Sequence, residues 1–372
     1  MRLVPAVRLG NVAADVRRRI PNATERPVSS PRRPRQRGFI QASSLALTTI
    51  LLSACANQHK PITAPVSAEA RAIEFLKREV PAWSRDNGCY SCHNNGDAAR
   101  ALYAARQSGY DIPNNALSDT SAWVAAPAEW DHSKGDPGFS DRRLADIQFA
   151  ASLVAGIESG VVKDHQAMKA AATRVAQAQA ENGSWPIDVA NVVGSPATYG
   201  TALATYMAWQ TLNYAPAPET AAAKQKAEER LRLIKPDTVP NAAVLLLFHG
   251  SRRGNEAKDF KHTQRSNPPA HVGGYETALA FLRGAQTRDG GWGPYADSPP
   301  EAFDTALALL ALAEFRKESG VTEMIERGRN YLIATQLTDG SWAATTRPSG
   351  GRSYAQQMST TGWVTLALLS TR

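Results

Sequence analysis

The stretch that decides the fold is QTRDGGW at residues 286–292, because its spacing, Gln-x-x-x-Gly-x-Trp, occurs three times in the chain. The other two copies are QAENGSW at 179–185 and QLTDGSW at 336–342. Self-similarity at one internal spacing is typical of repeat architectures. We therefore expect the chain to be built from copies of one small structural unit.

Each copy lies between two stretches that favour helix. An aromatic residue, Phe281 or Tyr331, stands five positions before the glutamine of the last two copies. After each tryptophan, a threonine (Thr201, Thr305 or Thr361) opens a run rich in Ala and Leu that is apolar nearly all round. Such runs predict buried helices. Each repeat is thus predicted to be a hairpin of an outer amphipathic helix and an inner apolar helix. We expect the glycine to end the outer helix, the tryptophan to cover the hairpin end, and the glutamine to bond free backbone groups.

These motifs resemble the QW repeats of squalene-hopene and oxidosqualene cyclases and the related repeats of protein prenyltransferase β-subunits, over roughly residues 160–372. The resemblance implies an all-α fold, an α/α toroid whose inner helices line a central cavity. The rest of the chain can be divided into the same units, which gives six hairpins. The predicted helix pairs are 68–80 with 96–108, 118–130 with 140–157, 164–180 with 196–212, 219–234 with 241–249, 275–286 with 301–317, and 321–336 with 357–370.

The resemblance does not extend to the catalytic acid. Class II triterpene cyclases protonate an alkene with the middle Asp of Asp-x-Asp-Asp-Thr, and the corresponding residues here are EAFDT at 301–305. Phe303 occupies the catalytic position and has no proton to donate. Asp304 is a weak catalytic candidate, and an N-cap or hydrogen-bonding role at the start of the inner helix is expected instead. Prenyl transfer is also disfavoured, because it needs a zinc-binding cysteine. Whether the protein is an enzyme is left open, and a haem-dependent oxidoreductase is favoured over a cyclase.

The second motif is NGCYSCHN at 87–94, which contains Cys-x-x-Cys-His, the attachment motif of c-type haem. In this motif Cys89 and Cys92 form thioethers with one covalent haem and His93 binds the iron axially. A Cys89–Cys92 disulfide, a redox dithiol and a zinc site are the alternatives, although no thioredoxin-like context and no second pair of zinc ligands is visible. Aligned with the repeats, Val80 stands where the first hairpin should have its glutamine. The haem motif is therefore predicted to occupy the connection of the first hairpin.

The second axial ligand is not determined by the sequence, and an open or water-bound position is equally compatible with it. His132 is nearest to the motif in sequence and is the candidate for this position. The other possible ligands are His165, His249, His262, His271, Met168, Met207, Met324 and Met358.

The first 54 residues have the parts of an export signal. They contain ten arginines, no lysine and only two acids, so they account for the whole formal net charge of +8. No nucleic-acid partner is therefore expected. An apolar stretch at 39–54 ends in Leu-Ser-Ala before Cys55, which resembles a bacterial lipobox with Cys55 as the lipidation site. A secretory signal with an incidental cysteine is the alternative. We expect a periplasmic protein, lipid-anchored to the outer membrane of a Gram-negative bacterium.

Together these features predict a leader at 1–54, a flexible tether at 55–67, and one toroid domain at 68–372 with a haem c site in its first hairpin. The favoured function is a monohaem cytochrome-like protein that transfers electrons to a periplasmic redox partner or performs haem-based redox chemistry. One alternative is a terpenoid cyclase-like or prenyltransferase-like protein that binds an apolar isoprenoid ligand. The other is a non-catalytic binding or scaffold lipoprotein.

Overall fold

The computed structural model describes residues 66–372 except 133–141, 188–192, 260–272, 346 and 348–352. The predicted leader, its lipobox at Cys55 and most of the tether lie outside the described residues. Within the described part of the chain, no helix is both long enough and apolar enough to cross a membrane.

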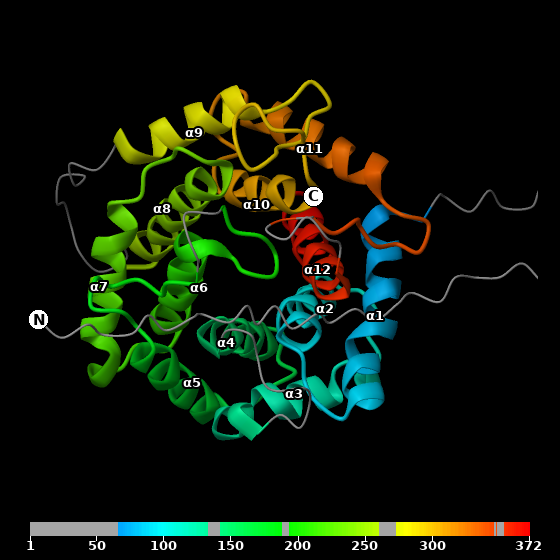
Figure 1. Ribbon diagram of the computed structural model, residues 1–372, viewed down its shortest axis with the longest axis vertical. Coiled ribbons are helices and arrows are strands. Elements are labelled where there is room, and N and C mark those ends of the chain that lie inside the picture. Colours follow the sequence, from blue (N-terminus) through cyan, green and yellow to red (C-terminus); the bar gives the residue numbers. More distant parts are fainter. Residues whose placement is uncertain (1–65, 133–141, 188–192, 260–272, 346, 348–352) are drawn as a thin grey trace, which may run out of the picture. The chain divides into compact units, whose positions relative to one another are not determined.

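Six helix hairpins form a closed ring, as Figure 1 shows. The inner helices contact one another in chain order, and α12 contacts α2, which closes the ring. The predicted all-α toroid of six hairpins is confirmed. Its outer and inner helices are α1 (Ala68–Asn87) with α2 (Ala99–Gln107), α3 (Ser118–Val124) with α4 (Arg142–Glu158), α5 (His165–Gln177) with α6 (Gly200–Tyr214), α7 (Ala221–Arg232) with α8 (Val239–Asp259), α9 (Gly273–Ala285) with α10 (Ala302–Ala313), and α11 (Val321–Thr335) with α12 (Tyr354–Ser370).

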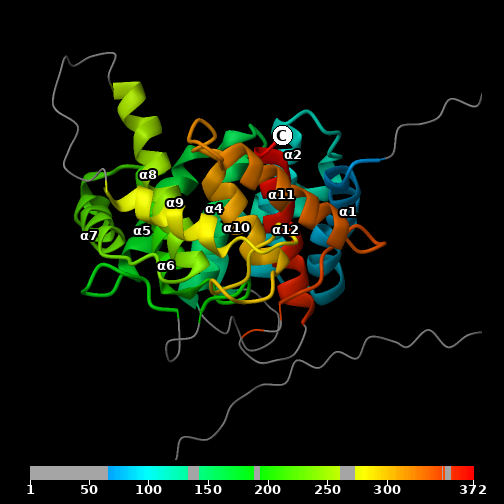
Figure 2. The same ribbon diagram turned by 90° about the horizontal axis from the view of Figure 1, so that it is seen from above.

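The division into outer and inner helices follows from polarity. Inner helix α10 buries nine of its twelve residues, including Phe303 and Asp304, because neighbouring helices cover it on several sides. Outer helix α7, with the same length, buries only Ala227 and Leu231. Figure 2, a view from above, shows the far end of α8 projecting beyond the ring.

The glutamine of each QW motif joins its hairpin to the next outer helix. Its side-chain Nε2 donates to the carbonyl oxygen of the motif glycine and to a carbonyl oxygen in the first turn of the next outer helix. The glutamines thus bond backbone groups as expected, but the second acceptor is a first-turn carbonyl, which is not one of the unpaired groups at a helix N-terminus. The bonds run from Gln179 to Gly183 (3.0 Å) and Ala223 (2.8 Å), from Gln286 to Gly290 (2.7 Å) and Met324 (2.9 Å), and from Gln336 to Gly340 (2.9 Å) and Ala68 (2.8 Å).

The third of these joints closes the ring. Gln336 follows the last outer helix and Ala68 begins the first, so residues 268 positions apart in sequence are joined by the same bond that joins neighbouring hairpins elsewhere. The guanidinium of Arg71 also donates to the side-chain oxygen of Gln336. Arg329 adds an ion pair with Glu69 at 3.2 Å across the same joint.

The motif tryptophans are fully buried and fix the two helices of one hairpin together. Each indole Nε1 donates to a carbonyl near the end of the outer helix, and each tryptophan backbone N–H donates to a threonine hydroxyl of the inner helix. The Nε1 bonds are Trp185 to Val175 (2.8 Å), Trp292 to Leu282 (2.7 Å) and Trp342 to Leu332 (2.8 Å). The backbone bonds are Trp185 to Thr205 (3.3 Å), Trp292 to Thr305 (2.9 Å) and Trp342 to Thr361 (3.3 Å).

One detail of the predicted repeat was wrong. The motif glycine does not end the outer helix, which stops five or six residues earlier. Instead it stands in the following turn at φ 81–95°, where a Cβ would come within 2.4–2.5 Å of a carbonyl oxygen of the next outer helix. Both the left-handed backbone and this close approach require glycine.

The outer part of the second hairpin, where the sequence pattern is less regular, is the short α3 followed by a 3₁₀ segment, η3 (Pro127–His132).

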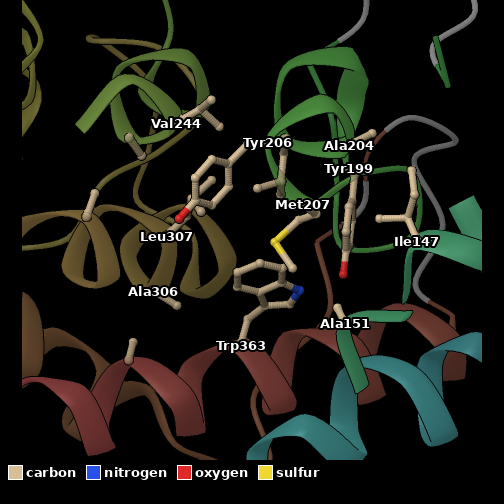
Figure 3. Close-up of a cluster of buried hydrophobic side chains, with 14 of the residues drawn as sticks. Ile147, Ala151, Tyr199, Ala204, Tyr206, Met207, Val244, Ala306, Leu307 and Trp363 are labelled. Carbon is tan, nitrogen blue, oxygen red and sulfur yellow. The ribbon is translucent and has the colours of Figure 1, made fainter. Parts of the chain in front are cut away.

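The middle of the ring is filled with side chains from the inner helices. In Figure 3, Tyr206 and Met207 of α6 and Trp363 of α12 point toward one another. These three residues and Tyr199 are each only 1–3% exposed. The family resemblance implied a central cavity lined by the inner helices, and at these side chains the middle of the ring is closely packed.

Candidate functional site

The Cys-x-x-Cys-His motif lies in the connection of the first hairpin. Helix α1 continues through Pro81 to Asn87 and ends at Gly88, which adopts the left-handed conformation with φ 63°. The second cysteine, Cys92, already begins a π-helix, η1 (Cys92–Ala98), which leads directly into α2. The predicted start of this helix at residue 96 is therefore four residues late. The side chain of Ser91 accepts hydrogen bonds from the backbone N–H groups of His93 and Asn94, which starts η1 at this point.

No disulfide joins the two cysteines of the motif. Their exposed fractions are only 8% for Cys89 and 9% for Cys92. Tyr90, between them, stacks on Trp123 with ring centroids 4.4 Å apart. Among the described residues, no group of three or more His, Cys, Asp and Glu side chains could hold a metal ion. The structure thus has neither the alternative disulfide nor, in its described part, a zinc-type ligand cluster.

His93 is held through one ring nitrogen. Its Nδ1 lies 2.9 Å from the hydroxyl oxygen of Ser359 in α12. Within the described residues its Nε2 has no hydrogen-bond partner. Burial in the interior lowers the pKa of His93 to about 4, although part of the residue remains exposed. The ring is therefore neutral at pH 7, which is the form that binds a metal.

Asp97, one turn along η1, is the centre of a buried polar network. Its carboxylate accepts hydrogen bonds from the hydroxyl of Tyr199 and from Nε2 of Gln148 (2.6 Å). Arg100 forms an ion pair with it at 3.6 Å. Burial raises the pKa of Asp97, and these donors and the cation oppose the rise.

Tyr199 is held in an unfavourable backbone conformation. Its φ of 62° makes it the non-glycine residue with positive φ in the described chain. Such strain persists where the surroundings impose it and often marks a functional site. Here the strained residue donates to Asp97, and its ring meets the edge of Trp363 at 5.6 Å. The guanidinium of Arg100 lies over the Trp363 ring, 4.7 Å from its centre.

Asp304 is fully buried and accepts hydrogen bonds from Arg347, which is one of its two expected roles. It is not the N-cap of α10, a position held by Glu301. The two terminal nitrogens of Arg347 donate to its two carboxylate oxygens at 2.9 and 3.2 Å. Burial raises the pKa of Asp304 to about 6, and Arg347 opposes this rise. With both oxygens accepting from a guanidinium at pH 7, Asp304 has no proton available for an alkene. Phe303, in the position of the cyclase acid, is buried with its ring edge against Trp363.

Buried polar atoms without a hydrogen-bond partner gather around η1. Unsatisfied groups of this kind are uncommon and point to water or a ligand. Some of these atoms belong to η1 itself or to nearby residues in sequence. Others belong to residues of α12 or to residues that contact Asp97 or Tyr90. These residues are Trp83, Asn94, Arg100, Trp123, Gln148, Thr360 and Trp363.

These observations fit the requirements of a covalent haem. Two cysteines without a disulfide, a histidine held at Nδ1 and, among the described residues, without a hydrogen-bond partner at Nε2, and several unpartnered polar groups lie around one segment. Thiols and an imidazole are the residue types that could hold a covalent haem.

Among the described residues, none of the possible second ligands contacts His93. Exposed His165 begins α5, and His249 lies beside Gly274 and the ring of Tyr275. Met207 is part of the ring's packed middle. The remaining methionines, Met168, Met324 and Met358, are buried in the cores of their helices, whereas His262, His271 and the side chain of His132 lie outside the described residues.

Sequence reasoning missed Ser359, Asp97, Tyr199, Arg100 and Arg347. A signal existed for Ser359, since the otherwise apolar inner helix α12 begins with the polar run MSTT at 358–361. Asp97 and Arg100 were visible as charges in a predicted inner helix. Arg347 lies in a connection with no recognisable pattern.

The fold has known relatives among solved structures. A type II terpene cyclase, MstE from Scytonema, is similar with a TM-score of 0.51 and 14% identity, over 81% of this chain and 96% of that one. A variant of MstE in complex with geranylgeranyl dihydroxybenzoate has a TM-score of 0.51 and 13% identity, over 82% and 97%. No protein-family model and no curated protein matches the chain. At this identity the similarity establishes a terpene-cyclase-like fold.

Proposed function

We propose that this protein is a monohaem c-type protein built on a terpene-cyclase-like toroid. Cys89 and Cys92 would attach the haem and His93 would bind its iron. The observation that carries the proposal is the state of His93, which is neutral, lies 2.9 Å through Nδ1 from Ser359 and has no hydrogen-bond partner at Nε2 among the described residues.

The residues of the first hairpin supply the attachment chemistry. Each thiol adds across one vinyl group, so a sulfur–carbon bond forms and the thiol hydrogen ends on the other vinyl carbon. No oxidant is consumed in this addition. When bound, the haem supplies one-electron transfer or the binding of a small ligand at iron. Stacked Tyr90 and Trp123 exclude water beside the thiols, and Ser359 orients the histidine.

A redox role agrees with the predicted export signal and lipid anchor at Cys55, because haem c is attached outside the cytoplasm. A periplasmic redox partner and an outer-membrane location are therefore part of the proposal. Alkene protonation is not part of it, because Phe303 stands in place of the acid and Asp304 is bound by Arg347.

The test is expression together with a cytochrome c maturation system. A haem-stained denaturing gel and a pyridine haemochrome spectrum then report covalent haem. We expect about one haem per chain in the wild type and none in the Cys89→Ser/Cys92→Ser variant. His93→Gln should alter the iron's spectrum. Covalent haem that survives loss of both cysteines would refute the proposal, as would its absence from the folded wild type.

The second candidate function is binding of an apolar isoprenoid ligand without cyclisation. The comparisons favour this candidate over the haem, because a structural neighbour has been solved with geranylgeranyl dihydroxybenzoate and neither neighbour is described as a haem protein. The apolar and aromatic middle of the ring has matching chemistry, but it is filled, so a ligand would have to displace Met207 or Trp363.

Tryptophan fluorescence tests this second candidate. Saturable quenching by geranylgeranyl dihydroxybenzoate, but not by dihydroxybenzoate without its chain, is the expected result. Equal responses to the two compounds would exclude recognition of the isoprenoid.

A further inference from the structure

A series of aromatic side chains leads from the Cys-x-x-Cys-His motif toward the outside of the ring. Tyr90, between the two cysteines, stacks on Trp123 of α3 with ring centroids 4.4 Å apart and planes only 10° from parallel. Trp123 meets Phe149 of α4 edge-on at 5.7 Å, and Phe149 meets Trp130 of η3 at 5.5 Å. The four rings therefore form a continuous series of contacts that crosses the second hairpin.

A hydrogen bond adds a second link between the two tryptophans. The indole Nε1 of Trp130 donates to the backbone carbonyl oxygen of Trp123 at 3.1 Å. Trp123 and Trp130 are thus joined both through the ring of Phe149 and directly through the backbone. Electron tunnelling weakens steeply across empty gaps and much less across contacting or hydrogen-bonded groups. Two parallel links of this kind therefore couple the two indoles.

The series ends beneath the surface at Arg174 of α5. Its guanidinium lies over the Trp130 ring, 6.0 Å from the ring centre. Ion pairs with Asp131 at 2.6 Å and with Asp146 at 2.7 Å hold the guanidinium in place. Arg174 also lines an open groove of about 520 Å³ between η3 and α5. Trp130 is fully buried, so the series of rings stops one side chain short of this groove.

Trp123 has a feature that packing alone does not explain. The residue is only 8% exposed, and its indole Nε1 is buried without a hydrogen-bond partner in the described chain. A buried donor without a partner costs free energy, and a phenylalanine at the same place would avoid that cost. What the indole adds is a larger π-system in contact with both Tyr90 and Phe149. This is the property that an electron route requires.

We propose that Tyr90, Trp123 and Trp130 form the route by which electrons pass between the haem attachment site and the surface at η3 and α5. The inference rests on the proposed haem function. In one transfer the iron changes from ferrous to ferric, and a one-electron carrier protein at this surface is reduced by one electron. The rings connect the two and undergo no net change. The cation of Arg174 disfavours a lasting positive charge on Trp130.

The first measurement needs no haem. A ruthenium photo-oxidant is attached at Gln177→Cys, an exposed position that lines the groove, in the full chain with Cys55, Cys89 and Cys92 changed to serine. After a laser flash, an added quencher leaves the label oxidised by one electron, and the label then takes an electron from the rings. We expect Tyr90 to lose that electron and its phenol proton, which gives a tyrosyl radical in transient absorption and electron paramagnetic resonance. Tyr90→Phe should lose this radical.

Trp123→Phe tests the middle of the route. It keeps an aromatic stack but is much harder to oxidise, so the radical should form at least about tenfold more slowly, which corresponds to a barrier about 1.4 kcal/mol higher. Trp83→Phe is the matched control, because Trp83 also has a buried Nε1 without a partner but stacks on Tyr354, away from the route. It should leave the rate unchanged.

Circular dichroism of each variant confirms that it is folded, and Tyr90→Phe, at a half-buried position, is the most conservative of the changes. A radical that survives in Tyr90→Phe would overturn the inference. So would equal rates in Trp123→Phe and the wild type, or an equal loss of rate in Trp83→Phe and Trp123→Phe.

The second measurement uses the haem-loaded protein with Cys55→Ser and the same label at position 177. Flash photolysis gives the rate of electron transfer between the label and the haem, and Trp123→Phe should lower it at least about tenfold. With the label moved to Gln225→Cys, an exposed position of α7, Trp123→Phe should change the rate little. An unchanged rate from position 177, or an equal loss from both positions, would refute the route. Failure of the haem function would instead appear as missing covalent haem in the wild type, with the haem-free radical result unaffected.

Discussion

Replacement of Gln336 by alanine should open the ring at its closing joint. The side chain donates to the carbonyls of Ala68 and Gly340 and accepts from Arg71, so three hydrogen bonds are lost. At a net value of about 1 kcal/mol for each bond, the free energy of unfolding should fall by about 3 kcal/mol.

Gln286→Ala is the matched control. Gln286 makes the equivalent two donor bonds, to Gly290 and Met324, in a joint between hairpins that are neighbours along the chain. Its loss should lower the free energy of unfolding by about 2 kcal/mol. Urea unfolding followed by circular dichroism gives both values.

Hydrogen exchange measured by mass spectrometry locates the effect. Gln336→Ala should speed exchange in the first turn of α1 and in the connection after α11, whereas Gln286→Ala should act on the first turn of α11. If Gln336→Ala leaves both the unfolding free energy and the α1 exchange at wild-type values, the closing joint does not stabilise the ring and the reasoning fails.

Two further changes test the repeat and the buried acid. Gly340→Ala should destabilise the protein by at least about 2 kcal/mol in urea unfolding, because φ is 95° and the new Cβ would lie 2.4 Å from the Arg71 carbonyl oxygen. Gly284→Ala is the control, since its Cβ would meet open space, and it should be neutral or stabilising by about 0.5 kcal/mol. Equal effects would contradict this account. The folded-state pKa of Asp304 is raised from 3.8 to about 6, so the folded state holds this proton more tightly, and stability should fall by about 3 kcal/mol as pH rises from about 4 to above 6. Asp304→Asn should remove this fall from the pH profile of unfolding, and an unchanged profile would show that Arg347 fully compensates the buried charge.

Much of the fold could be predicted because the repeat is encoded locally. The QW spacing located three hairpins, and the apolar runs located their inner helices to within a few residues. The sequence did not show which threonine of an inner helix accepts a hydrogen bond from the tryptophan. Thr201 and Thr205 are one helical turn apart, and the backbone N–H of Trp185 donates to Thr205. The role of the motif glycine depends on how closely the next hairpin approaches, which no local pattern contains.

The candidate site was predicted only in part for the same reason. The residues of Cys-x-x-Cys-His are contiguous, so the sequence displays them. Long-range bonds join His93 to Ser359, 266 residues away, and Asp97 to Tyr199, 102 residues away. These contacts exist because the last inner helix packs on the first hairpin, so they follow from ring closure and not from any motif.

The bond between Gln336 and Ala68 has a consequence for the order of the chain. Because the seam between the last and first hairpins uses the same bonds as the other QW joints, the ring does not depend on where the polypeptide starts. A circular permutant that links residue 372 to residue 66 and begins in the connection between α6 and α7, at Ala217, should keep the same circle of hairpins. The hairpin that carries Cys89 and Cys92 would then lie in the middle of the polypeptide, synthesised after its partner α12.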